Sequence, residues 1–352
     1  MEAASLGLSS GGLARYTSEL SLALARCFPQ DEFILVSDRP FPMPPGAPAN
    51  LKQGGGPRTA VERRWWLWGL GREARRWQAD LVHGPDFAVP YLPQLPSVLT
   101  LHDLSPWMDS GWHHAAHRVR RRSRVLLNLG IPTMILTHTE AVRKQALERF
   151  RIRPERIVAV PAAAASWLQP VIRTRPVGDS PSRPYFLYVG TLEPRKNLPM
   201  LLEAWREIRR DYEIDLVLAG RRRADGPQFC EEPGLRLPGE VPDERLPELY
   251  SGALAFVYPS LYEGFGLPVV EAMQCGACVI ASSACREAGG NAAVYADTPA
   301  ELAQAMRQAA ANPQWVAERQ AQSLARAKEF SWERTARLTY QVYEEARRRF
   351  GR

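Results

Sequence analysis

Short hydrophobic runs alternate with longer amphipathic segments along most of the chain. Nearly every position within a run is apolar and turn residues follow it, which is typical of parallel strands buried on both faces of a sheet. In the first half the runs are Phe33–Ser37, Asp80–His83, Ser97–His102, Thr133–Thr137 and Arg156–Val160. In the second half they are Tyr185–Val189, Asp215–Ala219, Leu254–Tyr258, Cys278–Ser282 and Ala293–Tyr295.

The segments between these runs have the apolar spacing of amphipathic helices. Strands that alternate with helices predict an α/β fold of doubly wound, Rossmann-like sheets. Such a domain normally opens with a strand, yet no convincing strand precedes Gly11, so either the first strand is irregular or the true start lies upstream of Met1. The clearest helices are expected at Ser18–Arg26, Glu140–Phe150, Pro199–Arg210, Pro268–Gln274 and Ser331–Phe350.

A break in the pattern divides the chain into two halves of similar size. With 352 residues the chain is long enough for two domains. The stretch 173–184 contains several prolines and no apolar periodicity, which indicates a linker. We therefore expect one domain at 1–172, a second at 185–330, and a final helix within 331–352.

Composition narrows the class of protein. The hydrophobic fraction of 45% suffices for a packed core, and 45 basic against 38 acidic residues leave a net charge of +7. Only four basic residues are lysines. Arginine binds phosphates and carboxylates bidentately, so an anionic substrate or anionic membrane headgroups fit this charge, and nucleic acid is not required. Five cysteines make no disulfide framework, and no signal peptide or membrane-spanning run is evident, so we expect a cytoplasmic, soluble or membrane-peripheral protein.

The stretch 258–273 runs from a buried strand through a glycine-containing loop into a helix. Amides at the start of that helix would form an anion site, and Gly264 and Gly266 would let the backbone approach a ligand closely. Glu263 precedes the loop and Glu271 falls in the first turn of the expected helix. Two acceptors thus bracket a site suited to a ligand with hydroxyls on both sides of a phosphate. The structural alternative is an ordinary helix N-terminal charge and a surface Glu in a turn.

A second candidate site follows the strand Tyr185–Val189. The strand leads to Gly190, and the loop after it presents the adjacent cations Arg195 and Lys196. Two cations beyond the carboxyl end of a parallel strand suit a diphosphate. A solvated basic turn is the structural alternative.

The first half offers weaker signals. Gly11 and Gly12 open a helix, although glycine punctuates many loops. His102 and Asp103 follow a buried strand, where polar residues of a doubly wound sheet usually face the crevice, while a satisfied structural histidine is the alternative. His83 ends another strand.

Together these motifs resemble the signature of retaining glycosyltransferases of the GT-B fold, family four. The resemblance rests on Glu263 and Glu271 with Gly-Phe-Gly-Leu-Pro between them, and on Gly-Thr-Leu-Glu-Pro-Arg-Lys-Asn. It implies that Glu271 binds the ribose, Glu263 and His102 face the transferred sugar, and the Arg-Lys pair neutralises the diphosphate; catalytic roles fall on His102, Glu263, Arg195 and Lys196. The implied donor-binding positions are Gly11, Gly12, Gly190, Thr191, Arg195, Lys196, Glu263, Gly264, Phe265, Gly266, Leu267 and Glu271.

The resemblance further implies two doubly wound domains facing across a cleft, a C-terminal helix that packs back on the acceptor-side domain, and a donor domain in the second half. It also implies that His83 and Asp103 lie on the acceptor side. The implied reaction moves a sugar from a nucleoside diphosphate sugar to a hydroxyl of a glycan or lipid-linked glycan. Mannose from GDP-mannose is favoured by similarity to bacterial mannosyltransferases of surface polysaccharide and lipopolysaccharide synthesis. Neither a cofactor nor a metal is expected. Many members have Arg where Thr191 stands, so this chain has one phosphate-binding cation fewer.

Several alternatives stay open. The chain could be a nucleotide-sugar-binding subunit without activity, or a nucleotide-sugar epimerase or phosphorylase of the same architecture; a dinucleotide oxidoreductase is disfavoured because no Gly-x-Gly-x-x-Gly follows a first strand. Cys275, Cys278 and Cys285 imitate half of a zinc site, and the histidines within 113–117 have helical ligand spacing, but structural roles are favoured for both. The stretches 63–72 and 117–124 mix aromatic or apolar residues with arginines, which fits either ordinary helices or contact with the inner membrane face.

Overall fold

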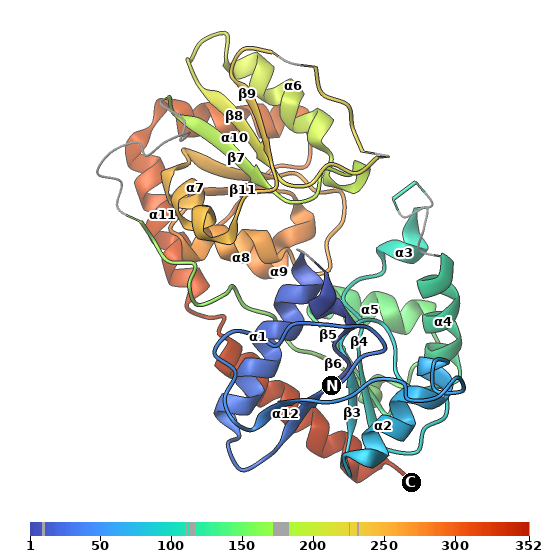
Figure 1. The fold of residues 1–352 in the computed structure, drawn as a ribbon. Coiled ribbons are helices and arrows are strands. Elements are labelled where there is room, and N and C mark those ends of the chain that lie inside the picture. The colour runs from blue at the N-terminus through green and yellow to red at the C-terminus, as the bar shows by residue number, and fades with distance from the viewer. Residues whose placement is uncertain are drawn as a thin grey trace. The chain divides into compact units, whose positions relative to one another are not determined.

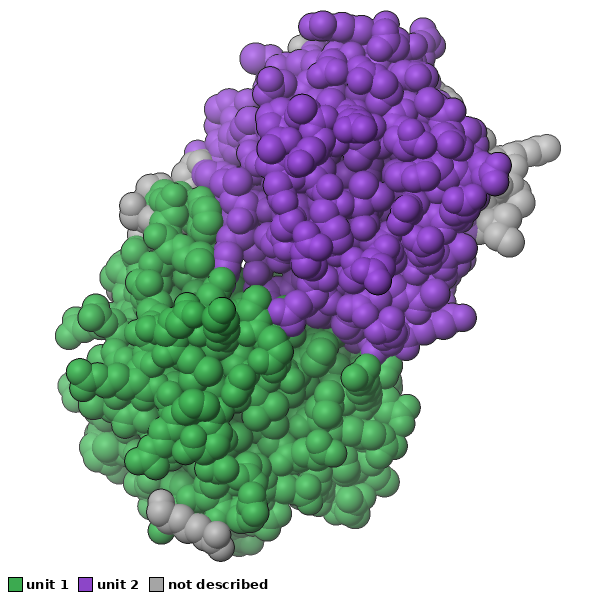
Figure 2. Space-filling view, turned by 180° about the vertical axis from the view of Figure 1, so that it is seen from behind, with its two compact units in different colours: residues 1–162, 331–352 green, residues 163–330 purple. Residues whose placement is uncertain are grey.

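The computed structural model describes residues 1–8, 11–109, 111–112, 117–171, 183–224, 226–230 and 232–351. The chain forms two compact units, residues 1–162 with 331–352, and residues 163–330 (Figure 2). This division precedes the linker predicted at 173–184, most of which lies outside the described residues. The final helix is grouped with the first unit.

Parallel strands form the centre of the first unit. A four-stranded sheet has the order β3-β4-β5-β6, and a separate pair joins β1 to β2, all in parallel (Figure 1). The pair β1 and β2 was only half predicted, because Leu51–Gln53 is short and only its first residue is buried. The strands are β1 (Phe33–Leu35), β2 (Leu51–Gln53), β3 (Val82–Gly84), β4 (Ser97–Thr100), β5 (Met134–Thr137) and β6 (Ile157–Ala159).

The first residues of the chain connect these two groups of strands. The Glu2 amide donates to the His83 carbonyl at 2.9 Å, and the Ala3 amide donates to the Val36 carbonyl at 2.8 Å. Residues 1–3 therefore lie between β1 and β3, where the opening strand of a doubly wound domain belongs. The expected alternative of an irregular first strand is therefore confirmed. The segment is irregular and includes a buried Glu, so it shows no apolar run; burial raises the pKa of this Glu2 to about 7.

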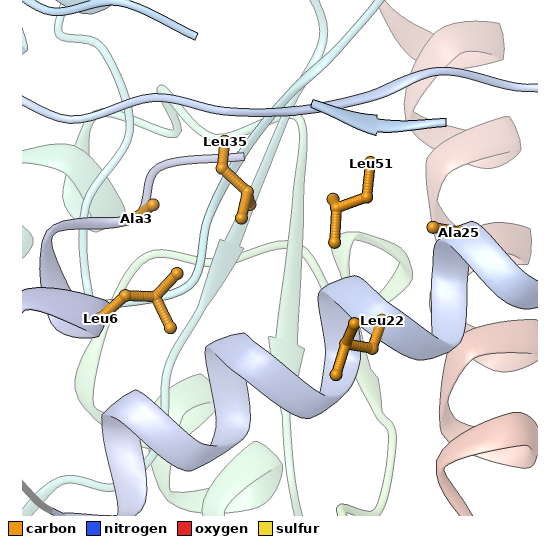
Figure 3. Packing of buried hydrophobic residues seen from close by; sticks show 6 residues of the cluster. All are labelled: Ala3, Leu6, Leu22, Ala25, Leu35 and Leu51. Atoms are coloured by element: carbon orange, nitrogen blue, oxygen red, sulfur yellow. The ribbon is translucent and has the colours of Figure 1, made fainter. Parts of the chain in front are cut away.

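Helices cover this sheet. The apolar face of α1 packs on residues of the opening segment and of β1 and β2; Figure 3 shows this cluster. The last helix, α12, lies beside α1 and also contacts β4 and β5 (Figure 1). The cluster contains Ala3, Leu6, Leu22, Ala25, Leu35 and Leu51. The helices are α1 (Gly12–Cys27), α2 (Leu70–Arg76), α3 (Ser105–Met108), α4 (His117–Asn128), α5 (Glu140–Arg149) and α12 (Trp332–Arg349).

The second unit is built on one parallel sheet of order β12-β11-β10-β7-β8-β9. The chain leaves β7 toward β8 and later returns to its other side at β10, so the strand order reverses between β7 and β10. β9 was not predicted, since Leu-Arg-Leu-Pro-Gly is a half-exposed edge strand rather than an apolar run. The strands are β7 (Tyr185–Val189), β8 (Asp215–Ala219), β9 (Leu235–Gly239), β10 (Ala255–Tyr258), β11 (Val279–Ala281) and β12 (Val294–Tyr295).

The helices of the second unit follow these strands in turn. The largest fully buried side chain, Trp205, lies on α6 and donates from its indole nitrogen to the Ile214 carbonyl at 2.9 Å. These observations confirm the predicted α/β class with parallel sheets. The helices are α6 (Leu198–Ile208), α7 (Leu246–Gly252), α8 (Leu267–Gln274), α9 (Arg286–Gly289), α10 (Pro299–Ala311) and α11 (Pro313–Ala327).

Glycine permits a close backbone approach at the carboxyl ends of β7 and β8. The amide of Gly190 donates to the carbonyl of Ala219 at 2.9 Å, and Gly220 follows with a φ of +144°. A Cβ on Gly220 would lie 1.9 Å from the carbonyl oxygen of Gly190. Only glycine fits here, and the loops after both strands start from this contact.

Replacing Gly220 with alanine tests this contact, with Gly239→Ala as the matched control. Gly239 has a φ of +75°, but a Cβ there meets no atom within 4 Å among the described residues. We expect Gly239→Ala to lower the free energy of unfolding by about 1 kcal/mol, the cost of a left-handed residue. Gly220→Ala should lower it by about 3 kcal/mol or more, since two backbones clash. Equal losses in urea unfolding would contradict the close approach.

Candidate active site

Two buried cations lie just beyond the carboxyl end of β7. After Gly190 the chain extends to a 3-10 turn, Pro194–Lys196, which carries Arg195 and Lys196. Both side chains are buried, with residue exposures of 9% and 6%. Asn197 then takes a left-handed conformation, with a φ of +53°, and starts α6.

Glu263 reaches the same place from the loop after β10. The Lys196 ammonium donates to Oε1 of Glu263 at 2.6 Å and to the Tyr258 hydroxyl at 2.7 Å. Nη1 of Arg195 lies 3.3 Å from that same Oε1 and donates to the Tyr262 carbonyl at 2.7 Å. The sequence prediction depends on four side chains, those of Arg195, Lys196, Glu263 and Glu271. The structure brings the first three together.

A second carboxylate extends the set of charges. Oε1 of Glu193 accepts from Nη2 of Arg195 at 2.8 Å, and its Oε2 accepts from Nη1 of Arg223 at 2.6 Å. Arg223 comes from the loop after β8. We call the resulting row of alternating charges the ion chain; its order is Arg223, Glu193, Arg195, Glu263 and Lys196. It holds three cations and two carboxylates, so it carries one net positive charge.

The neighbouring charges decide the protonation state of each carboxylate. Burial alone would raise the pKa of Glu263, but Lys196 and Arg195 outweigh it and lower the pKa to about 2. Burial likewise opposes ionisation of Glu193, and Arg195, Lys196 and Arg223 lower its pKa. Burial, assisted by Arg195, lowers the pKa of Lys196 against the pull of Glu263. At neutral pH both carboxylates are ionised.

Helix α8 begins directly after the glycine loop. Gly266 has a φ of +89°, and a Cβ on it would lie 2.9 Å from Sγ of Cys285. The helix starts at Leu267, so Glu271 lies beyond its first turn, and the prediction that Glu271 falls within that turn was wrong. Glu271 is buried and accepts a hydrogen bond from the Tyr250 hydroxyl at 3.1 Å.

The remaining donor-side positions are backbone features. The Thr191 carbonyl accepts from the Tyr188 hydroxyl at 3.0 Å, and Gly190 is left-handed with a φ of +151°. Phe265 is buried and packs edge-on against Phe330, with ring centroids 5.5 Å apart. The side chain of Phe265 is thus part of the core. A ligand would therefore meet the backbone of Phe265 and of the loop around Gly264.

In the first unit, His102 forms a pair with His138. The rings come from the ends of the adjacent strands β4 and β5, and Nδ1 of His102 lies 2.8 Å from Nε2 of His138. Nε2 of His102 lies 2.5 Å from the Pro85 carbonyl oxygen, and Nδ1 of His138 lies 3.3 Å from the Val160 carbonyl oxygen. Burial lowers the pKa of both, to about 3 for His138. Both ring nitrogens of His102 are therefore engaged within the unit.

The other first-half candidates have local structural partners. His83 is buried and contacts the Tyr343 hydroxyl at 2.6 Å and the Thr100 hydroxyl at 2.8 Å. Burial lowers its pKa well below the usual range, so His83 is a core histidine, and its acceptor-side role stays a prediction. Asp103 accepts from the amide and hydroxyl of Ser105 and shapes the turn into α3.

Comparison with known proteins assigns the family. The family model Glycosyltransferase Family 4 matches residues 10–164, and the model Glycosyl transferases group 1 matches residues 183–312. The O-antigen chain mannosyltransferase B of Escherichia coli is 35% identical over 299 residues, which cover 77% of this chain and 75% of that protein. The chain belongs to the family 4 glycosyltransferases.

Two further similarities extend this result. The serotype-specific mannosyltransferase WbdA of Escherichia coli is 27% identical over 232 residues, which cover 59% of this chain and 28% of that protein. The solved structure of sucrose-phosphate synthase from Thermosynechococcus elongatus superposes with a TM-score of 0.73 at 20% identity, over 98% of this chain and 97% of that one. The glycosyltransferase therefore has the GT-B fold, with two Rossmann-like domains, as the sequence predicted.

Gly11 and Gly12 begin the first long helix of this glycosyltransferase. Gly11 precedes α1 with a φ of +123°, and a Cβ on either glycine meets no atom within 4 Å among the described residues. The backbone at the start of α1 is thus uncrowded, as the sequence interpretation of a ligand-facing glycine loop requires.

The cysteine and histidine motifs with the spacing of metal ligands form no cluster of metal-binding side chains in the part of the glycosyltransferase that the structure describes. Cys275, Cys278 and Cys285 are buried free thiols, and burial raises the pKa of each. His117 is exposed, while residues 113–116 lie outside the described residues.

The two basic stretches have different environments. In the stretch 63–72, Trp65 is buried, Arg72 lies 3.7 Å from Glu62, and Arg122 stacks on Trp66, so this segment packs against the unit. On α4, by contrast, the exposed Arg121 and Arg124 stand beside the exposed Val125, and the exposed Leu129 directly follows the helix. Within the described ranges, the glycosyltransferase has no helix whose length and hydropathy would let it cross a bilayer.

Sequence reasoning missed part of the site of this glycosyltransferase. It assigned no role to Glu193, Arg223 or His138, although each follows a predicted strand at its carboxyl end. The rule that selected Arg195 and His102 would have found them, because polar residues at these ends share one edge of a parallel sheet. What the rule cannot give is which of them meet.

Glu263→Gln tests the electrostatics of the ion chain. A carboxyl whose pKa falls from its ordinary 4.5 to about 2 on folding stabilises the protein above about pH 4.5, and this contribution is lost as the pH falls toward 2. The shift corresponds to about 3 kcal/mol. We expect Glu263→Gln to unfold more easily in urea at pH 7, and the difference from wild type to shrink between pH 4.5 and 2.5. A difference independent of pH would contradict the assigned ionisation.

Proposed function

We propose that this glycosyltransferase transfers a sugar from a nucleoside diphosphate sugar that binds in the second unit, with retention of the anomeric configuration. The observation that carries this proposal is the ion chain at the carboxyl ends of β7 and β10. Ligands of open α/β sheets bind where the strand order reverses, and this is the position of Arg195, Lys196 and Glu263. The net positive charge and the start of α8 suit a diphosphate.

The donor we favour is GDP-mannose. Support comes from the relatives, since the O-antigen chain mannosyltransferase B and WbdA are both named as mannosyltransferases. The acceptor we infer is a hydroxyl of a glycan or lipid-linked glycan of the O-antigen type, reached at the cytoplasmic face of the membrane. Glu271 is assigned to the ribose hydroxyls and Glu263 to hydroxyls of the transferred sugar.

The chemistry follows from where charge develops. As the bond from the anomeric carbon to the diphosphate breaks, the carbon becomes oxocarbenium-like and negative charge grows on the leaving group. Arg195 and Lys196 stabilise that charge more in the transition state than in the ground state. The acceptor oxygen bonds to the anomeric carbon, and its proton leaves to the departing diphosphate. Because protein cations hold the diphosphate, no metal ion is required.

His102 is held in place within the first unit. Its two ring nitrogens contact the Pro85 carbonyl oxygen and His138, so it can act as a general base only after one of these contacts breaks. We therefore assign His102 a shaping role at the edge of β4, with no proton transfer in the proposed reaction.

We also propose that the first unit contacts anionic lipid through α4. Arg121 and Arg124 are exposed on this helix, and Val125 and Leu129 beside them have exposures of 40% and 71%. Leu129 follows Val125 by four residues, so both lie on one face. Cations next to exposed apolar side chains fit the interface of an anionic bilayer.

Transfer from GDP-mannose is the first test of function. Nucleoside diphosphates should raise the melting temperature of the wild-type protein, and labelled mannose should appear in an O-antigen-type acceptor without loss of activity in EDTA.

Lys196→Ala should lower kcat/KM about 100-fold or more. Lys328→Ala, an exposed lysine of the same unit, is the control and should leave transfer unchanged. Unaltered turnover in Lys196→Ala would remove the ion chain from the reaction, and an interconverted sugar nucleotide without transfer would favour an epimerase.

Vesicle binding tests the lipid proposal. Removing two surface arginines near a bilayer costs about 2 kcal/mol, so Arg121→Ser with Arg124→Ser should weaken cosedimentation with phosphatidylglycerol vesicles about 30-fold. Leu261→Ser, at a residue 57% exposed in the second unit, is the control and should bind as wild type. Equal sedimentation of all three proteins would overturn the role of α4.

A further inference from the structure

Arg223 occupies a fixed place beside the loop that carries the buried cations. The loop after β8 continues next to the loop after β7, because the Leu192 amide donates to the Arg221 carbonyl at 2.9 Å and the Arg223 amide donates to the Leu192 carbonyl at 3.4 Å. Leu192 and Arg222 thus form a parallel bridge beyond the end of the sheet. Backbone pairing therefore delivers the side chain of Arg223 to Glu193.

The two ends of the ion chain differ in their access to solvent. The side chains of Lys196 and Arg195 are 7% and 10% exposed, whereas that of Arg223 is 21% exposed. Arg223 is therefore the cation of the ion chain that a ligand arriving from solvent reaches most readily. Thr191, at the start of the loop after β7, adds no charge to the ion chain.

The charge balance of the ion chain also points to Arg223. Two carboxylates already neutralise two of the three cations, and a diphosphate brings at least two negative charges. A guanidinium has five N–H donors in a rigid fork, so it can hold a carboxylate and a phosphate at once. Lysine at this position would offer a point charge and no fork.

We propose that Arg223 is a third diphosphate-binding cation of the donor site and that Glu193 is the residue that positions it. Glu193 holds the guanidinium of Arg223 on one oxygen and that of Arg195 on the other, so both arginines present donors to one anion. This inference rests on the proposed function, because it assigns a further residue to the same donor. It adds a cation from β8 to a site otherwise built from β7 and β10.

The competing explanation is that Arg223 only neutralises the buried Glu193. The two explanations differ in how the loss of ligand affinity on substitution of Arg223 depends on the charge of the ligand. A residue that contacts the diphosphate contributes to the affinity for a nucleoside diphosphate and contributes much less to the affinity for the monophosphate. A residue that only braces Glu193 affects both ligands equally, together with the stability of the fold.

Calorimetric titration of GDP and GMP into the full chain separates these outcomes. We expect Arg223→Ala to weaken GDP binding about 10- to 100-fold, the worth of a charged hydrogen-bonding contact, and to change GMP binding less than about threefold. Arg223→Lys should fall between wild type and Arg223→Ala for GDP. Arg221→Ala, an exposed arginine two residues earlier, is the matched control and should bind both ligands as wild type does.

The contradicting results are distinct. Wild-type GDP affinity in Arg223→Ala would overturn the proposal while leaving the proposed function intact. Equal losses for GDP and GMP, with a lower unfolding free energy in urea, would reduce Arg223 to a structural brace. If wild-type protein binds neither GDP nor UDP, the proposed function fails and this assignment fails with it.

Discussion

Charge pairing inside the second unit is the constraint on which the site depends. Two nearly buried cations would be costly in isolation, and they are tolerated because Glu193 and Glu263 lie within hydrogen-bonding distance. The same pairing fixes the cations before any ligand arrives, which is how a site stabilises developing charge without reorganising. An anion that enters must therefore share Arg195 and Lys196 with carboxylates already bound to them.

The parallel topology explains how residues so distant in sequence meet. Lys196 and Glu263 are 67 positions apart, yet each follows one of two strands that lie side by side in the sheet. The carboxyl end of β8 comes next to that of β7 at Gly220, whose missing side chain lets the β8 loop start against Gly190. A single glycine contact thus governs whether Arg223 reaches the ion chain.

The sequence predicted the class of fold, because hydrophobic runs locate parallel strands, and the resemblance to family four implied that Arg195, Lys196 and Glu263 meet at one donor. It could not show that Arg223 meets Glu193, since that requires knowing that β8 lies next to β7 and how their loops pair. It left the opening segment at residues 1–3 undecided, because backbone hydrogen bonds rather than an apolar run mark this irregular strand. It also placed Glu271 in the first turn of its helix, because the left-handed Gly266 that sets the start of α8 leaves no signature in the apolar pattern.

The histidine pair limits what the first unit can contribute to catalysis. A carbonyl oxygen only accepts hydrogen bonds, so the contact with Pro85 requires a proton on Nε2 of His102 and the contact with Val160 requires one on Nδ1 of His138. The hydrogen bond between the two rings then needs one further, shared proton. With these contacts in place both ring nitrogens of His102 are engaged, so neither takes a proton from an acceptor hydroxyl. Burial lowers the pKa of both rings and therefore opposes the shared proton. The proposed mechanism accordingly passes the proton to the leaving diphosphate and draws its rate from the charges that stabilise this group.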